Sequence, residues 1–396
     1  MRFSLSDQYT RVVKENLRIF VNDSYRGFMY REQRAYLNEL DPSLVSPREE
    51  AAAIGKNGKY YRGNVYLFKV MNRDNVNVAK PVDTEYRATI SVDAAGRSAF
   101  ADGEKVPLRT GFPSLSKEAV AVGETWQAEG VEHRLDEEGT FLEVPFRCNY
   151  TYKGRDEYQD RPVVVIGTSY TYRDLDSESN SNKTGLKLRG KIEGGIYLFT
   201  DSKGGYFIRE RVERYLLGGA EGQRRESGFR LVWSEGFSRE HIDAMEERIA
   251  EANNGAAGDG VAEEGGRGTE KEDEIEVSRS DEGVVLNLPN IHFEPDQAVI
   301  LPEERSRLDK LAKLLRKVPE ASFLVKGHTA DVGSAESQIE LSRERAKTII
   351  DELAERGFAP TRFIYKGLGG SEPVASNESE EGRAKNRRVE IVVFSR

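Results

Sequence analysis

The sequence predicts a multidomain protein in which a β-rich N-terminal part is followed by a C-terminal α/β domain. Three observations support this prediction. The chain has 396 residues, which is long for a single hydrophobic core. Before about residue 250, apolar and polar residues alternate with the period of two that is typical of strands. After about residue 280, helical periods alternate with short apolar runs, the pattern of an α/β layer pair.

The β-rich part is expected to be an antiparallel sandwich or an open barrel. Clusters of Gly, Asp, Asn and Ser separate its apolar runs, as hairpin turns require. Strict alternation at Phe229, Leu231 and Trp233 indicates a sheet with one solvated face, which is the habit of antiparallel sheets. The predicted strands span residues 60–70, 86–92, 141–152, 162–172, 192–199, 206–217 and 228–233.

Changes in composition suggest the domain boundaries. The turn-rich stretch 111–123 divides the β-rich part into subdomains 1–115 and 116–250. Ile242, Met245 and Ile249 have the spacing of a short amphipathic helix that closes this part. Residues 251–276 carry nine acidic and two basic side chains and many glycines, so they are expected to form a flexible, self-repelling linker.

The remaining residues, 277–396, are predicted to form the α/β domain. Leu308, Leu311 and Leu315 mark one face of a helix, and a second helix ends at Gly357. The unit between Phe323 and Tyr365 fits a parallel strand–helix–strand crossover. Apolar runs at 284–293, 323–325, 362–366 and 389–394 are the expected strands.

Composition excludes several classes of partner. The net charge is −9, most of it in the 251–276 segment, and no basic face stands out, so we expect no nucleic acid partner. No apolar run is long enough for a transmembrane segment, and the first residues lack the apolar core of an export signal.

Few residues outside the C-terminal domain suggest chemistry. Cys148 lies at one of the alternating apolar positions of its predicted strand, so it is expected to be a small buried hydrophobic residue. The four histidines are scattered, so we expect no metal and no other cofactor. The segment 174–185 resembles the start of a calcium loop, but Ser179 and Gly185 stand where such a loop needs Gly and Glu, so a solvated turn is favoured.

The most informative stretch is Gly327 to Ala346, GHTADVGSAESQIELSRERA. Upstream lies His292-Phe293-Glu294-Pro295-Asp296, and downstream lies Asn386-Arg387-Arg388. With these motifs in this order, about residues 280–396 resemble the OmpA-like C-terminal domain, a periplasmic module that associates with peptidoglycan without a covalent bond.

The resemblance implies a site for the diamino acid of the peptidoglycan stem peptide. Its carboxylate would meet Arg345, and its ammonium would meet Thr329 and Asp331, because binding both charges requires an arginine fork and an acid. Gly327, Gly333 and Asn386 would support the loop. Two positions depart from the family pattern: Ala330 replaces the ligand Asp, with Asp331 one place later, and Gln338 replaces an Asn.

These features lead to a first hypothesis and two alternatives. The first is a non-enzymatic cell-envelope protein of the periplasm, associated with the outer membrane. It binds peptidoglycan through a module altered at Ala330, and other envelope proteins are further expected partners. The second is a structural or interaction protein whose module no longer binds the wall. The third is a wall hydrolase using Glu124, Glu129 and Asp136, whose spacing does not single out a catalytic pair.

Overall fold

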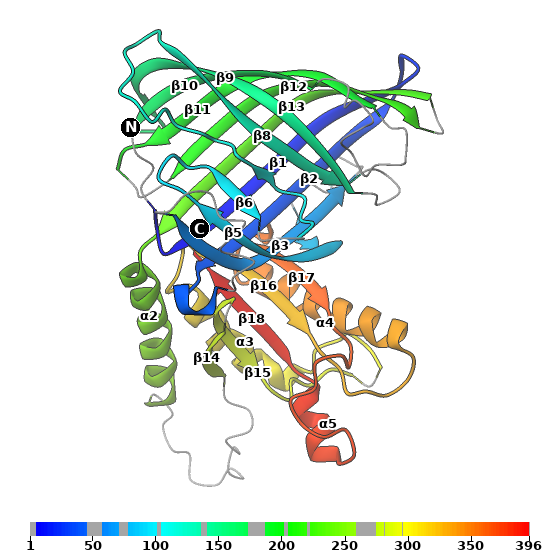
Figure 1. Cartoon of the computed structure of the whole chain (residues 1–396). Helices are drawn as coiled ribbons and strands as arrows, with labels where there is room; N and C mark the ends of the chain where they lie inside the picture. The colour runs from blue at the N-terminus through cyan, green and yellow to red at the C-terminus, as the bar shows by residue number, and fades with distance from the viewer. Residues whose placement is uncertain are drawn as a thin grey trace. The chain divides into compact units, whose positions relative to one another are not determined.

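The computed structural model contains two compact units (Figure 1). The first unit comprises Met1–Val76 and Asp83–Ser238, and the second comprises Asn77–Val82 and Arg239–Arg396. The structure describes residues 5–45, 58–70, 78–100, 104–135, 141–172, 187–201, 205–219, 222–258, 275–280, 282–294 and 296–395.

The first unit is built on one antiparallel sheet of twelve strands, in the order β6-β5-β3-β2-β1-β13-β12-β11-β10-β9-β8-β7. The sheet curls so far that its edges approach each other, and the Gly111 N–H donates to the Ser98 carbonyl over 2.8 Å. Its elements are β1 Gln8–Val21, β2 Ser24–Glu39, η1 Pro42–Leu44, β3 Lys59–Val70, β5 Thr84–Val92, β6 Ser98–Phe100, β7 Arg109–Thr110, β8 Thr125–Leu135, β9 Phe141–Tyr158, β10 Arg161–Tyr172, β11 Lys187–Phe199, β12 Tyr206–Gly219 and β13 Gly222–Phe237.

This architecture confirms the β-rich prediction and decides between its two forms. A single curled sheet corresponds to the open barrel and not to the sandwich. The expected division near residue 115 is wrong, because strands from both sides of it pair in one sheet and enclose one core. The sequence reading failed there because the turn-rich stretch joins β7 to β8, two neighbours in the same sheet.

Alternation along the strands explains how the sheet acquires an inside and an outside. On β9, Leu142, Val144 and Phe146 are buried inside, while the intervening Glu143 and Arg147 are exposed. Tight turns set the register. Between β1 and β2, Asn22 and Asp23 both have positive φ, of 48° and 62°, as a two-residue hairpin turn requires.

The second unit is an α/β domain with a six-stranded sheet in the order β14-β15-β18-β16-β17-β4. β16 and β17 run parallel, as the predicted crossover requires. No helix among the described residues is long and apolar enough to cross a membrane. The elements are β4 Lys80–Pro81, α2 Arg239–Gly258, β14 Glu276–Ser280, β15 Gly283–Leu288, η4 Pro302–Glu304, α3 Arg305–Leu315, β16 Ser322–Gly327, α4 Ala335–Glu355, η5 Pro360–Arg362, β17 Phe363–Gly367, α5 Glu380–Asn386 and β18 Val389–Phe394.

The structure corrects the predictions made around the linker. Helix α2 exists, but Met245 and Ile249 pack in the core of the second unit and do not close the β-rich part. The helix also continues to Gly258, into the stretch expected to be linker. Of that stretch, residues 259–274 lie outside the described residues.

Inside the first unit, the strand register creates a row of alternating charges. Residues of opposite sign face one another directly on β2, β1, β13 and β12. In order across the sheet they are Arg31, Glu15, Arg230 and Glu210. Directly opposed unlike charges attract, so the register that buries the apolar side chains also pairs the charged ones.

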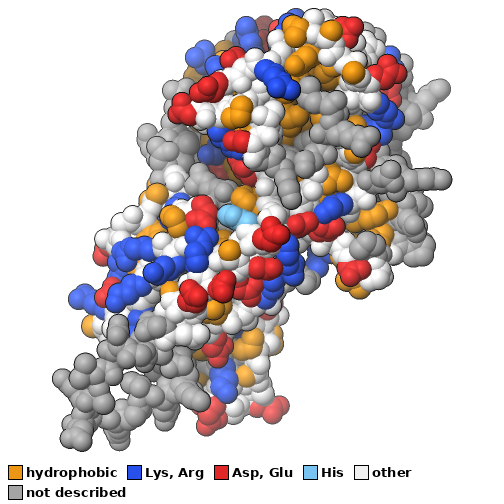
Figure 2. All heavy atoms as spheres, turned by 90° about the vertical axis from the view of Figure 1, so that its left-hand side faces the viewer, with side chains coloured by type: hydrophobic (Ala, Val, Ile, Leu, Met, Phe, Trp, Pro, Cys, Tyr) orange, Lys and Arg blue, Asp and Glu red, His pale blue; other side chains and the backbone are white. Residues whose placement is uncertain are grey.

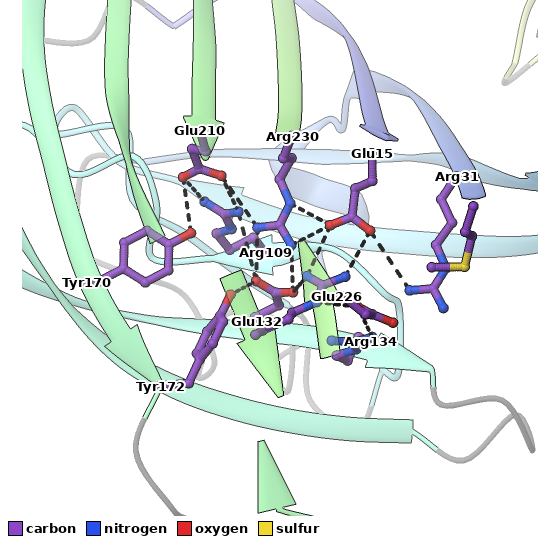
Figure 3. A network of polar contacts seen from close by, with 12 residues as sticks. Glu15, Arg31, Arg109, Glu132, Arg134, Tyr170, Tyr172, Glu210, Glu226 and Arg230 are labelled. Atoms are coloured by element: carbon purple, nitrogen blue, oxygen red, sulfur yellow. Dashed lines mark hydrogen bonds and ion pairs between the residues drawn. The ribbon is translucent and has the colours of Figure 1, made fainter. Parts of the chain in front are cut away.

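Charged residues from β7 and β8 meet this row across the interior (Figure 3). Arg109 donates to both carboxylate oxygens of Glu210, each over 2.9 Å. Arg230 donates to the two oxygens of Glu132 over 2.7 and 3.0 Å. Such charge-assisted, two-point contacts are strong and directional. They join strands that are distant in the sheet order and so hold its curvature.

The same arginines keep the buried carboxylates ionised. Burial alone would raise the pKa of Glu15, but Arg214 and Arg31 outweigh burial and lower this pKa to about 2. A folded-state pKa below the usual 4.5 means that the ionised pair stabilises the fold at neutral pH. That contribution is lost as the pH falls from the usual value toward the folded one.

We predict that Glu132→Gln destabilises the first unit by about 3–5 kcal/mol, because it removes a buried carboxylate that pairs with both Arg230 and Arg214 and leaves the network with an excess of positive charge. Urea unfolding followed by tryptophan fluorescence measures this effect, since both tryptophans, Trp126 and Trp233, lie in the first unit. Glu129→Gln on the same strand is the control, because the Glu129 side chain is 77% exposed and pairs with Arg147 at the surface. Equal unfolding midpoints for the two variants would contradict the prediction.

Candidate functional site

The candidate site lies where β16 ends and α4 begins. β16 is buried along its whole length, so its end is held by the core of the second unit. Helix α4 passes very close to it: a Cβ on Gly327 would lie 2.0 Å from the carbonyl oxygen of Ser342. Gly327 is therefore required by the packing of the helix on the strand.

The loop between these elements is fixed by backbone and cap hydrogen bonds. The Thr329 N–H donates to the Gly369 carbonyl over 2.9 Å. Gly333 has a φ of 96°, a conformation that favours glycine. Ser334 caps α4 by accepting from the Ser337 N–H. Thr329 is nearly buried, and its hydroxyl has no hydrogen-bond partner among the described residues.

Gln338 holds the acidic residue of the loop. Its side-chain amide donates to Asp331 Oδ1 and to the Gly333 carbonyl, both over 3.2 Å. Its Oε1 accepts from the Gly370 N–H over 3.0 Å. Gln338 is itself buried, whereas Asp331 is exposed. Ala330, beside it, is buried and cannot supply a carboxylate.

Arg345 projects from α4 into a different set of neighbours. Its Nε donates to the Gln297 carbonyl over 3.0 Å, and its guanidinium lies 4.8 Å from the centre of the Phe293 ring. No carboxylate among the described residues forms an ion pair with it. Burial and the neighbouring Arg387 lower the pKa of Arg345, and the opposite influence of Asp296 is smaller. The residue is thus a nearly buried cation with too little negative charge around it.

The structure does not join the predicted ligand residues by hydrogen bonds or ion pairs. Asp331 is hydrogen-bonded to Gln338, and among the described residues no hydrogen bond or ion pair links it to Arg345 or to Thr329. Two further residues that shape the site were not predicted. Gln297 provides the backbone carbonyl that accepts from Arg345, a role that does not depend on the type of its side chain. Asn377 accepts from the Asp331 N–H over 3.3 Å.

Asn386 fastens the loop that carries Asn377. Its Oδ1 accepts from the Val374 and Ala375 N–H groups, and its Nδ2 donates to the Ala375 carbonyl and to Asn377 Oδ1. With four hydrogen bonds and almost complete burial, Asn386 is a structural residue. Its expected supporting role therefore has a physical basis.

His328 is a packing residue at the end of β16. It is buried, and its Nε2 lies 3.6 Å from the Glu390 carboxylate. Burial lowers the pKa of His328 despite this acid, so the ring is neutral at pH 7. A group of three His, Cys, Asp or Glu side chains suited to a metal ion is not found within the described part of the chain.

The weaker candidate residues of the first unit do not form a comparable arrangement of side chains. Cys148 is fully buried, and burial raises the pKa of its thiol to about 12, in agreement with the role of a small hydrophobe. Glu129 pairs with Arg147 at the surface, and Glu124 accepts from the Ala121 N–H in a turn. Asp136 and residues 174–185 lie outside the described residues.

Surface charge offers no single dominant patch on the face drawn in Figure 2, where basic and acidic side chains are interspersed. This is the usual pattern of a solvated surface. The candidate site is distinguished by the environment of individual residues, above all Arg345.

Comparisons with known proteins concern this same region. Residues 292–387 match the model of the OmpA family. Probable lipoprotein YiaD of Escherichia coli is 34% identical over 120 residues, which are 30% of this chain and 55% of that protein. Peptidoglycan-binding protein ArfA of Mycobacterium tuberculosis is 44% identical over 103 residues, 26% of this chain and 32% of ArfA. A solved MotB-like protein from Desulfovibrio vulgaris is 28% identical with a TM-score of 0.34, covering 40% of this chain and 95% of that one.

We predict that Asn386→Ala destabilises the second unit by about 1–3 kcal/mol, because it removes the four hydrogen bonds with which this buried side chain holds the loop. The unfolding midpoint from circular dichroism at 222 nm, where the helices of the second unit contribute most of the signal, measures the change. Asn287→Ala is the matched control, because Asn287 lies on β15 of the same unit and makes an exposed hydrogen bond with Glu276. A loss as small as that of the control would contradict the structural role.

Proposed function

We propose that this chain, whose residues 292–387 form an OmpA family domain, is a bacterial cell-envelope protein that associates non-covalently with peptidoglycan. The name of the ArfA relative, a peptidoglycan-binding protein, supports the proposal. The chain spans about half of YiaD and a third of ArfA, so the proposal concerns this domain first. A periplasmic location, association with the outer membrane and a non-enzymatic role follow from it as further parts of the proposal.

The observation that carries the proposal is the state of Arg345. A nearly buried guanidinium without a carboxylate partner is costly, and an anionic ligand would remove that cost. The diamino acid of the stem peptide presents a carboxylate that a guanidinium binds at two points. Arg387 nearby strengthens the attraction for such an anion.

The ammonium of the ligand would be met by Asp331 and Thr329. Gln338 occupies Oδ1 of Asp331 and leaves Oδ2 without a hydrogen bond among the described residues. The Thr329 hydroxyl is also without a partner. Both groups are acceptors suited to an ammonium. A shift of the loop would bring Asp331 to the ammonium, while Gln338 keeps its hydrogen bond to Oδ1 of Asp331.

Cosedimentation with purified peptidoglycan tests the assignment of Arg345. We expect Arg345→Ala to lower the affinity about 30-fold or more, because a buried charge partner contributes about 2–5 kcal/mol to binding. Arg343→Ala is the control on the same helix, since Arg343 is exposed and pairs with Glu340. Wild-type protein that stays in solution, or equal retention of both variants, would refute the proposal.

The second candidate function is a structural or interaction role in the envelope without wall binding. Two observations favour it: Ala330 lacks a carboxylate, and Asp331 is engaged by Gln338. In that case other envelope proteins would be the partners.

Ala330→Asp separates the two functions. If the module has lost its ligand, the substitution should create retention on peptidoglycan, by restoring an acid at the loop position the family uses. If the wild type already binds, the gain should be small, and tight binding by wild-type protein would exclude the second function. The same cosedimentation assay measures both outcomes.

A further inference from the structure

The first unit contains a cavity of about 490 Å³ inside its curled sheet. This volume lies within the range of roughly 300–1,000 Å³ in which proteins bind small molecules. Side chains from β1, β2, β3, β8 and β13 line it, so it belongs to the first unit alone. It borders the charge network of Figure 3 but is not filled by it.

The cavity wall combines apolar side chains with an excess of basic ones. Val13, Leu67 and Val232 provide apolar surface from three strands, with Pro107 and Leu135 beside them. Seven basic and four acidic residues also line the cavity. Of the four acids, Glu32 is engaged by Arg34 and Asp83 accepts from the Lys69 N–H. Glu15 and Glu132 form ion pairs with Arg230 within the charge network.

Arg134 is the most informative residue of the cavity wall, because its guanidinium is buried while some of its hydrogen-bond donors lack partners. It is only 6% exposed, and its Nε and Nη1 have no hydrogen-bond partner among the described residues. Its Nη2 lies 3.5 Å from Glu226 Oε2, an oxygen that already accepts from Arg214 Nε over 2.5 Å. The Glu226 carboxylate is thus shared by three guanidinium groups, since Arg224 Nε lies 3.2 Å from Oε1, and Arg134 is the most distant of the three.

Arg31 provides a second cation at the same wall. It reaches its nearest acid, Glu15, only at 3.9 Å, and that carboxylate already accepts from Arg214 and Arg230. Burial lowers the pKa of Arg31, and the nearby Arg134 and Arg214 act in the same direction against Glu226 and Glu15. The wall therefore lacks negative charge where Arg31 and Arg134 face the cavity.

We propose that this cavity binds an amphipathic carboxylate, a small molecule with one anionic head and an apolar chain. The carboxylate would accept from the free donors of Arg134 and from Arg31, and the chain would lie against Val13, Leu67 and Val232. The head satisfies buried donors, and the chain removes apolar surface from water. This site is independent of the wall-binding site in the second unit.

Isothermal titration calorimetry of the whole chain with decanoate, below its micellar concentration, tests the proposal. We expect saturable binding at one site. Acetate, which lacks the chain, and decanol, which lacks the charge, should each bind at least about tenfold more weakly. Decyl phosphate is the arm that distinguishes a phosphate from a carboxylate head. Binding of decyl phosphate but not decanoate, or equal binding of decanol, would overturn the proposal.

Variants identify the residues responsible. Arg134→Met should weaken decanoate binding about tenfold to a hundredfold, as expected for a lost charge-assisted hydrogen bond. Arg147→Met is the control, because Arg147 is exposed on the neighbouring strand β9 and outside the cavity. Unchanged binding by Arg134→Met would overturn the assignment.

A second variant covers the case in which Arg134→Met does not fold. The Arg31 side chain is 24% exposed, so Arg31→Met is better tolerated. Decanoate should raise the melting temperature of the wild type, and this rise should be smaller for Arg31→Met. An equal rise in both proteins would also reject the site.

Discussion

A guanidinium that leaves water must meet negative charge inside the protein, and this constraint organises both units. In the first unit, one network joins four nearly buried arginines and four nearly buried glutamates: Arg109, Arg134, Arg214, Arg230, Glu15, Glu132, Glu210 and Glu226. Their equal numbers make burial tolerable, because the opposite charges offset one another, with Arg134 the least closely paired. The strand register achieves this pairing, so the shape of the sheet and the state of its charges depend on each other.

Where this balance is weakest, we propose anion-binding sites. Arg345 and Arg134 are both nearly buried; Arg345 has no ion pair among the described residues, and Arg134 reaches a shared carboxylate, that of Glu226, at 3.5 Å. An apolar residue at either position would remove the cost of burial, so unsatisfied guanidinium groups indicate ligand binding more than stability. The two sites differ in what lies beside the cation: loop acceptors and a second arginine in one unit, an apolar cavity wall in the other.

Much of the fold was predictable because it depends on periodicity. The helix that ends at Gly357 and the strand containing Cys148 follow directly from apolar spacing. The interior network was not predicted, although β12 carries a signal: Glu210 and Arg214 share the parity of Ile208 and Val212. Within the sequence of a single strand, charged residues at positions that face the core look like interruptions of the apolar pattern. Only the register, which aligns Glu210 with Arg230 and Glu15, turns them into pairs.

The motif leads to Thr329, Asp331 and Arg345 as the proposed site residues, but it does not predict their geometry. Asp331 is held by Gln338, whose side-chain amide reaches both the loop and Gly370. Gln338 and Asp331 are therefore coupled in space, because the buried amide holds Oδ1 of the acid. Oδ2 of Asp331 has no hydrogen bond among the described residues, so a ligand ammonium would not have to displace the amide. The ammonium would add an ion pair that the neutral amide cannot form, while Arg345 would hold the ligand's carboxylate at the same time.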